Sequence, residues 1–159
     1  MTRLPHRLLF VLSLVGLPAG LSCAHDKAAQ KAPEKEMADL SSKAESFWRA
    51  VRWSDPVGAS TAVEDVEQRR TWLSVMGAEM EAERYMDASL IDIGLGAPDP
   101  DPAATRLQPG WVKIQVQSYT MPAQVLKTRV VTQRWVRTHG GWFLDWDGGD
   151  PFALEPQPR

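Results

Sequence analysis

Apolar residues between positions 37 and 84 recur at intervals of three and four, which is the period of an amphipathic helix. This spacing predicts a helix from Met37 to Trp53, with a buried side made of Met37, Leu40, Ala44, Phe47, Trp48 and Val51. The helix should end near Pro56, because the residue before a proline resists helical geometry. A short helical turn is expected over 57–62. A longer helix is expected over 63–84, with a buried side made of Val63, Val66, Leu73, Met76 and Met80.

After residue 84 the period changes to two, which is typical of strands. The pattern predicts strands over 85–95, 111–119, 124–137 and 142–146. Val112, Ile114 and Val116 should share one face of the second strand. The Thr138-His139-Gly140-Gly141 segment predicts a tight hairpin, because glycine tolerates the positive φ of such turns. Helices followed by an antiparallel meander indicate an α+β fold, here with the helices packed on a curved sheet.

The N-terminal segment 1–22 has the order of residues that is typical of a secretory signal peptide. Arg3 and Arg7 precede an apolar run from Leu8 to Leu17, and small residues follow it. The run of about ten residues is too short for a transmembrane helix, which needs roughly 20. We therefore expect residues 1–22 to be removed during export.

Cys23 is the only cysteine, so it cannot form a disulfide within the chain. The segment Gly20-Leu21-Ser22-Cys23 resembles the lipobox of bacterial lipoproteins, although Gly20 stands where that family has leucine. The resemblance implies lipid attachment at Cys23, and Ala24 after it implies sorting to the outer membrane, with the domain facing the periplasm. The alternative is ordinary signal cleavage, for example after Ala24, which would give a secreted or periplasmic soluble protein.

The rest of the chain is divided by composition into a tether, one domain and a tail. Residues 23–35 hold the lipid-attachment cysteine and a polar segment expected to be a flexible tether. Residues 36–147 form one domain, and residues 148–159 are expected to be a loose tail. Removing residues 1–22 changes the formal net charge from −2 to −4. Without a basic stripe, nucleic acid is not an expected partner.

The last predicted hairpin carries a resemblance to a known superfamily. Val131 to Arg137, the turn and Trp142 to Trp146 resemble the closing hairpin of nuclear transport factor 2-like domains, which are also called SnoaL-like or cystatin-like cone folds. The helix over 37–53 is similar to the first helix of such domains. The resemblance implies a curved sheet that wraps around the helices and leaves a cone-shaped pocket. That superfamily includes enzymes and non-catalytic envelope domains, and some members dimerise, so a homodimer is an expectation by analogy.

Three aspartates lie in predicted strands, namely Asp87, Asp92 and Asp145. A carboxylate inside an apolar cone would have a raised pKa and could act as a general base beside a tyrosine hydroxyl. Asp92 with Tyr119, or Asp145 with Tyr85, would make such a pair. Strand alternation also places side chains outward, and a solvated role is the simpler expectation for each aspartate. His139 in the hairpin turn is expected to be exposed, and no residue cluster predicts a metal or a cofactor.

Seven tryptophans are the most unusual feature of the composition. Most should be core residues, because a large aromatic side chain buries roughly 150 to 250 Å². If those of the last hairpin face the cone or the outside of the sheet, they would form a ligand site made of Trp135, Trp142, Trp146 and Tyr119.

The leading functional hypothesis is a non-enzymatic envelope lipoprotein domain that binds a small apolar ligand or a partner protein. Two alternatives stay open. One is a small isomerase or dehydratase that uses a pocket aspartate, and the other is a purely structural interaction module whose cone is packed solid with tryptophan.

Overall fold

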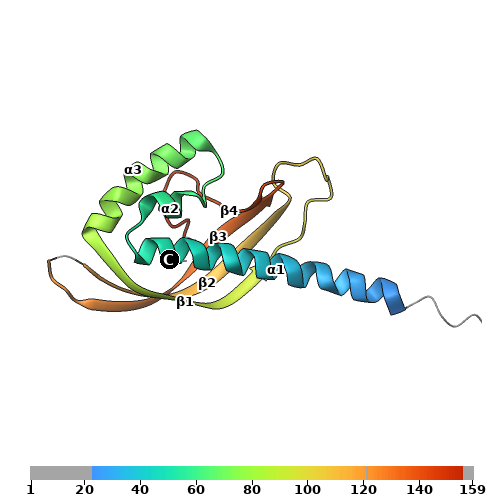
Figure 1. The fold of residues 1–159 in the computed structure, drawn as a ribbon, viewed down its shortest axis with the longest axis horizontal. Coiled ribbons are helices and arrows are strands. Elements are labelled where there is room, and N and C mark those ends of the chain that lie inside the picture. Colours follow the sequence, from blue (N-terminus) through green and yellow to red (C-terminus); the bar gives the residue numbers. More distant parts are fainter. Residues whose placement is uncertain (1–22, 121, 156–159) are drawn as a thin grey trace, which may run out of the picture.

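The computed structural model describes residues 23–120 and 122–155, and its side chains from residue 32 onward (Figure 1). The signal segment 1–22 and the side chain of Cys23 lie outside the described residues. No helix in this part of the chain is both long and apolar enough to cross a bilayer.

In the described part of the chain, three helices precede a four-stranded antiparallel sheet, as the α+β prediction requires. The helices are α1 (Cys23–Arg52), α2 (Pro56–Ser60) and α3 (Val66–Ala82). The strands are β1 (Glu83–Leu95), β2 (Gln108–Thr120), β3 (Leu126–Thr138) and β4 (Gly141–Leu144), and they pair in the order β1-β2-β3-β4. In Figure 1 the helices cover one face of the curved sheet, and the N-terminal turns of α1 project beyond it.

Helix α1 begins earlier than the sequence pattern predicted. It includes residues 23–35, which were expected to be a flexible tether. Alanine, lysine, glutamine and glutamate dominate this segment, and all four favour helix, although Pro33 lies inside it. The predicted buried side is confirmed from Leu40 onward, because Leu40, Ala44, Phe47, Trp48 and Val51 are all buried.

Both short connections around α2 and α3 are fixed by aspartate caps. The Asp55 carboxylate accepts the backbone N–H of Gly58, and the Asp65 carboxylate accepts that of Gln68. Such bonds satisfy backbone donors at a helix start. Because Asp65 starts α3, Val66 lies in its first turn and is 58 % exposed, so its predicted burial is wrong. The buried side of α3 consists of Trp72, Met76 and Met80.

The predicted alternation of β2 is confirmed, with Val112, Ile114 and Val116 buried against the helices. On β3 the inward positions are Val131, Gln133 and Trp135. The expected turn is also present, since β3 ends at Thr138 and β4 begins at Gly141, which has a φ of +123°.

The C-terminal segment is not the loose tail that its composition predicted. Phe152 and Ala153 are buried in the core, and Leu154 forms a bridge with Gln133 of β3. The Phe152 ring stacks on Trp48 of α1 at a centroid distance of 5.2 Å. A single large aromatic residue, Phe152, therefore anchors this polar segment to the core. Residues 156–159 lie outside the described residues.

Candidate functional site

The three tryptophans proposed as ligand-binding residues belong to the core. Trp135, Trp142 and Trp146 are 1 %, 2 % and 7 % exposed. Trp135 packs edge-to-face against Phe47 of α1 at 6.2 Å. Tyr119, the fourth proposed residue, is half-buried at an outward position of β2, since its neighbour Ser118 is buried. The four side chains therefore do not converge on one site.

Gln133 is the polar centre of this core, and the sequence analysis missed it. Its side-chain oxygen accepts the indole N–H of Trp48 at 3.1 Å and that of Trp135 at 3.0 Å. Its amide nitrogen donates to the backbone oxygen of Phe152 at 2.9 Å. These bonds connect α1, β3 and the C-terminal segment. Strand alternation could have found Gln133, because it shares an inward face with Val131 and Trp135.

The first proposed acid–base pair, Asp92 with Tyr119, does not form. Asp92 is exposed, and its carboxylate accepts the backbone N–H of Ile93 at 2.9 Å. Asp92 lies opposite Lys113 of β2, six residues before Tyr119. At about 3.4 Å per residue this offset is roughly 20 Å along the strand.

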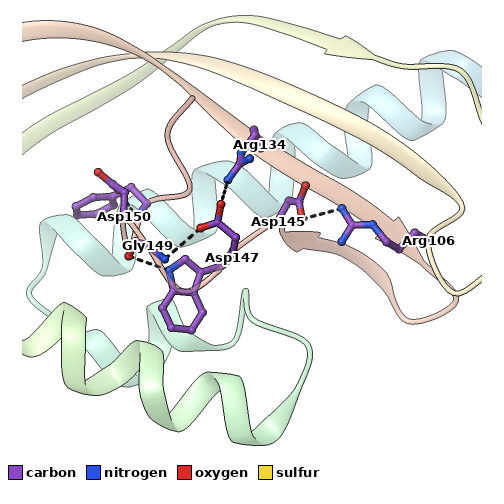
Figure 2. Close-up of polar contacts among 8 residues, drawn as sticks. Arg106, Arg134, Asp145, Asp147, Gly149 and Asp150 are labelled. Atoms are coloured by element: carbon purple, nitrogen blue, oxygen red, sulfur yellow. Dashed lines mark hydrogen bonds and ion pairs between the residues drawn. The ribbon is translucent and has the colours of Figure 1, made fainter. Parts of the chain in front are cut away.

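The second proposed pair, Asp145 with Tyr85, is also separated by its contacts. Asp145 forms an ion pair with Arg106 at 2.7 Å (Figure 2). Tyr85 is buried, and its hydroxyl donates to Glu83 at 3.4 Å. Burial, followed by the negative charge of Glu83, raises the pKa of Tyr85 above its ordinary value. Each member of the pair therefore has a different partner.

The two remaining candidates lie at the surface. Asp87 forms an ion pair with Arg52 at 3.5 Å, and about half of its side chain is exposed. His139 is exposed in the hairpin turn, as expected. No group of three or more histidine, cysteine, aspartate or glutamate residues suited to a metal ion occurs in the described part of the chain.

A groove lies beside β3, between this strand and the C-terminal segment. Its volume is about 730 Å³, and its walls come from residues 129–132 and Arg134 of β3 and from Asp147, residues 149–150 and residues 153–155 of the C-terminal segment. Arg134 donates to the Asp147 carboxylate at 3.0 Å, which lowers the pKa of that carboxyl group (Figure 2). Asp147 also accepts the backbone N–H of Gly149 at 3.1 Å. One end of the groove is therefore held in shape by an ordered turn.

The groove follows a strand edge that is only partly paired. Strand β4 pairs with residues 135–138 of β3. Beyond it, Arg134 donates its backbone N–H to Ala153, and Glu155 donates its own to Thr132, both at 3.0 Å. Within the described residues, no segment pairs with this side of β3 between Leu126 and Val131. The chemistry that this edge offers is backbone hydrogen bonding to an extended chain.

No family model matches the chain, and no curated protein matches it significantly. Among solved structures, the chain is similar to a candidate dehydratase of the NTF2-like family from Streptomyces avermitilis, with 15 % identity, a TM-score of 0.45, and coverage of 70 % of this chain and 93 % of that one. It is also similar to the intermembrane space region of the chloroplast protein ARC6, with 13 % identity, a TM-score of 0.42, and coverage of 80 % and 94 %. Both similarities concern the fold alone.

Proposed function

We propose that this chain is a non-enzymatic lipoprotein domain of the bacterial cell envelope that binds a partner protein. The observation that carries the proposal is the filled interior between helices and sheet. Trp72, Trp135 and Gln133 are almost completely buried there, and both tryptophans pack against Phe47. A small apolar ligand needs a concave pocket, and the space where the cone would hold one is occupied by these side chains. Of the two expected ligand classes, the partner protein is therefore favoured.

The lack of a catalytic pair among the expected residues supports the non-enzymatic part of the proposal. A general base must lie within hydrogen-bond reach of the proton that it removes, in a site where its pKa is tuned. Asp92 is exposed, and Asp145 is neutralised by Arg106. Neither carboxylate lies in an apolar pocket beside a tyrosine hydroxyl.

Attachment to the membrane rests on the lipobox-like start of the chain. A lipid on Cys23 would hold the domain at the membrane, since each buried CH₂ group contributes about 0.8 kcal/mol. We expect intact-mass analysis of the chain made in a bacterium to show a lipid adduct after loss of residues 1–22. The Cys23→Ser variant should leave the membrane fraction. A wild-type chain that keeps Met1 and stays soluble inside the cell would contradict this part.

Partner binding can be tested separately from attachment. Titration of the purified domain with palmitate and with 1-anilinonaphthalene-8-sulfonate should give no saturable change in tryptophan fluorescence, because five of the seven tryptophans are buried in a filled core. Reversible lysine cross-linking in intact cells should give a discrete adduct with another envelope protein. Saturable quenching by palmitate, together with no protein adduct, would favour the small-ligand function.

A further inference from the structure

The free edge of β3 presents backbone groups in a defined direction. On the side away from β2, the backbone N–H and C=O of Arg134 are both hydrogen-bonded, and the C=O of Thr132 accepts a hydrogen bond. In an antiparallel strand every second residue points its backbone groups to the same side. Thr128 and Val130 therefore direct their N–H and C=O groups away from β2, where no described segment pairs with them.

The opposite edge of the sheet is protected in a way that β3 is not. The pairing of β1 with β2 shifts between Tyr85 and Asp87, and again between Leu90 and Asp92. Bulges of this kind twist an edge and discourage pairing with another chain. The pairing of β2 with β3 is regular over its whole length. Strand β3 is therefore the better template for an added strand.

Side chains along the free edge specify what can lie beside it. Leu126 and Val130 are 61 % and 50 % exposed on the outer face. Lys127 and Arg129 alternate with them and point to the other face, where Arg129 lies 3.4 Å from Glu83. Lys127 is exposed and is in no ion pair among the described residues. Cations on one face and apolar groups on the other favour a strand that is acidic and apolar at alternate positions.

A second copy of this chain and the chain's own C-terminal end fit this edge less well than a segment of another protein. A second copy that paired β3 with β3 around a two-fold axis would bring Lys127 and Arg129 of one chain close to the same residues of the other, and like charges across strands are destabilising. The end of this chain carries Pro156 and Pro158, which have no backbone N–H to donate.

We propose that the β3 edge from Leu126 to Val131, beyond the part of the groove that Asp147, Asp150 and Glu155 line, binds an extended segment of a different protein by strand addition. The segment pairs its backbone with Thr128 and Val130. Its acidic side chains face Lys127 and Arg129, and its apolar side chains extend the outer face beside Val130. This proposal deepens the proposed function and rests on its partner-binding part.

Binding can be measured by fluorescence anisotropy with a labelled synthetic peptide, acetyl-TEVEVEVET-amide. The same peptide with lysine in place of glutamate, and one N-methylated at alternate residues, are the peptide controls. We expect saturable binding of the acidic peptide and at least tenfold weaker binding of both controls, since a tenfold change is only about 1.4 kcal/mol. Equal binding of the acidic and basic peptides, or no binding of the acidic one, would overturn the proposal.

Two variants locate the site. Val130→Pro removes the N–H that faces the groove and should weaken binding at least tenfold, whereas Val130→Ala keeps that N–H and should weaken it less than about threefold. The Lys127→Glu/Arg129→Glu double variant should reverse the preference to the basic peptide, which keeps the test decisive even if Val130→Pro fails to fold. Unchanged preference in that double variant would overturn the proposal.

Three further experiments distinguish the proposed partner from other occupants of this edge, and failure of this site from failure of the proposed function. Removal of residues 156–159 should leave affinity unchanged, and a tenfold gain would identify the chain's own end as the occupant. Sedimentation should give a monomer, and a dimer abolished by Val130→Pro would identify a second copy. In cells, a photo-cross-linker at Thr128 should capture a partner, and one at Ser74, which is exposed on α3, should not. Capture only at Ser74 would reject this site and retain partner binding, whereas capture at neither position, with no lysine cross-link, would reject both.

Discussion

Trp48 on α1 donates its indole N–H to the side chain of Gln133 on β3, at 3.1 Å and across 85 positions of the chain. The same oxygen accepts the indole N–H of Trp135, and the amide nitrogen of Gln133 donates a hydrogen bond to the backbone oxygen of Phe152. A single buried amide therefore connects the first helix, the sheet and the C-terminal segment. Buried polar groups that are fully bonded in this way stabilise one arrangement of the core.

Replacing Gln133 with leucine should destabilise the protein strongly. The substitution leaves two buried indole N–H groups and one backbone oxygen without partners, and each costs about 1 to 3 kcal/mol. We expect the free energy of unfolding to fall by about 3 to 5 kcal/mol in urea titrations. Gln115→Leu on the outer face is the control, and it should change stability by about 0.5 kcal/mol or less. Equal effects of the two changes would show that the network contributes little.

Trp142 and Trp72 form a matched pair that separates hydrogen bonding from packing. Both are buried, but Trp72 donates to the backbone oxygen of Pro151, whereas the Trp142 indole N–H has no partner within the described residues. Changing either to phenylalanine removes similar volume. Trp142→Phe also removes an unpaired donor, so it should be the milder change by about 2 kcal/mol. Thermal and urea unfolding of the two variants would test the difference, and a larger loss for Trp142→Phe would contradict it.

The buried hydroxyl of Tyr85 should make stability fall at high pH. Its folded-state pKa lies above the unfolded value of about 10. Below about pH 10 both states keep the proton, so the protonated phenol contributes its full stability. As the pH rises above that value only the unfolded chain ionises, and stability is lost until the folded-state pKa is passed.

The measurement for Tyr85 is a comparison of the wild-type protein with Tyr85→Phe at pH 8 and pH 11. Relative to the wild type, Tyr85→Phe should gain about 1 kcal/mol of unfolding free energy between these two values. Tyr119→Phe, measured in the same way, gives the contribution of the other tyrosine. A constant difference between the wild type and Tyr85→Phe would show that the phenol ionises as readily in the folded state.

Two glycines should respond to alanine in opposite directions. A Cβ atom on Gly110 of β2 would lie 2.8 Å from side-chain atoms of both Leu40 and Trp142, which are buried. Gly110→Ala should therefore cost about 1 to 3 kcal/mol of stability. A Cβ atom on Gly77, inside α3, would meet nothing within 4 Å, and Gly77→Ala should stabilise by up to about 1 kcal/mol. Urea unfolding of both variants tests the signs, and destabilisation by Gly77→Ala would be unexpected.

The periodic segments of the sequence determined the order of elements and much of the core. Spacing of three and four placed Leu40, Phe47 and Val51 on the buried side of α1, and alternation placed Val112 and Ile114 on the inner face of β2. These predictions succeed because an amphipathic segment can bury only one face, whatever its partner.

Local chemistry and tertiary contacts decided the rest. The helical start of α1 follows from residue propensity where a polar composition indicated a tether. The docking of Phe152 against Trp48 depends on residues that are far apart in the chain. Periodicity is silent on such contacts, because it reports which side of a segment is buried and not what covers it.

The candidate site shows the same division. The sequence by itself determined that the last hairpin is rich in tryptophan and that β3 alternates. Only the tertiary structure decided that Trp135 and Trp142 fill the interior, and that β4 ends at Leu144 and leaves part of the β3 edge open. The physical reason is that an unpaired edge is a property of neighbouring strands, so it exists only once their lengths and register are set by packing.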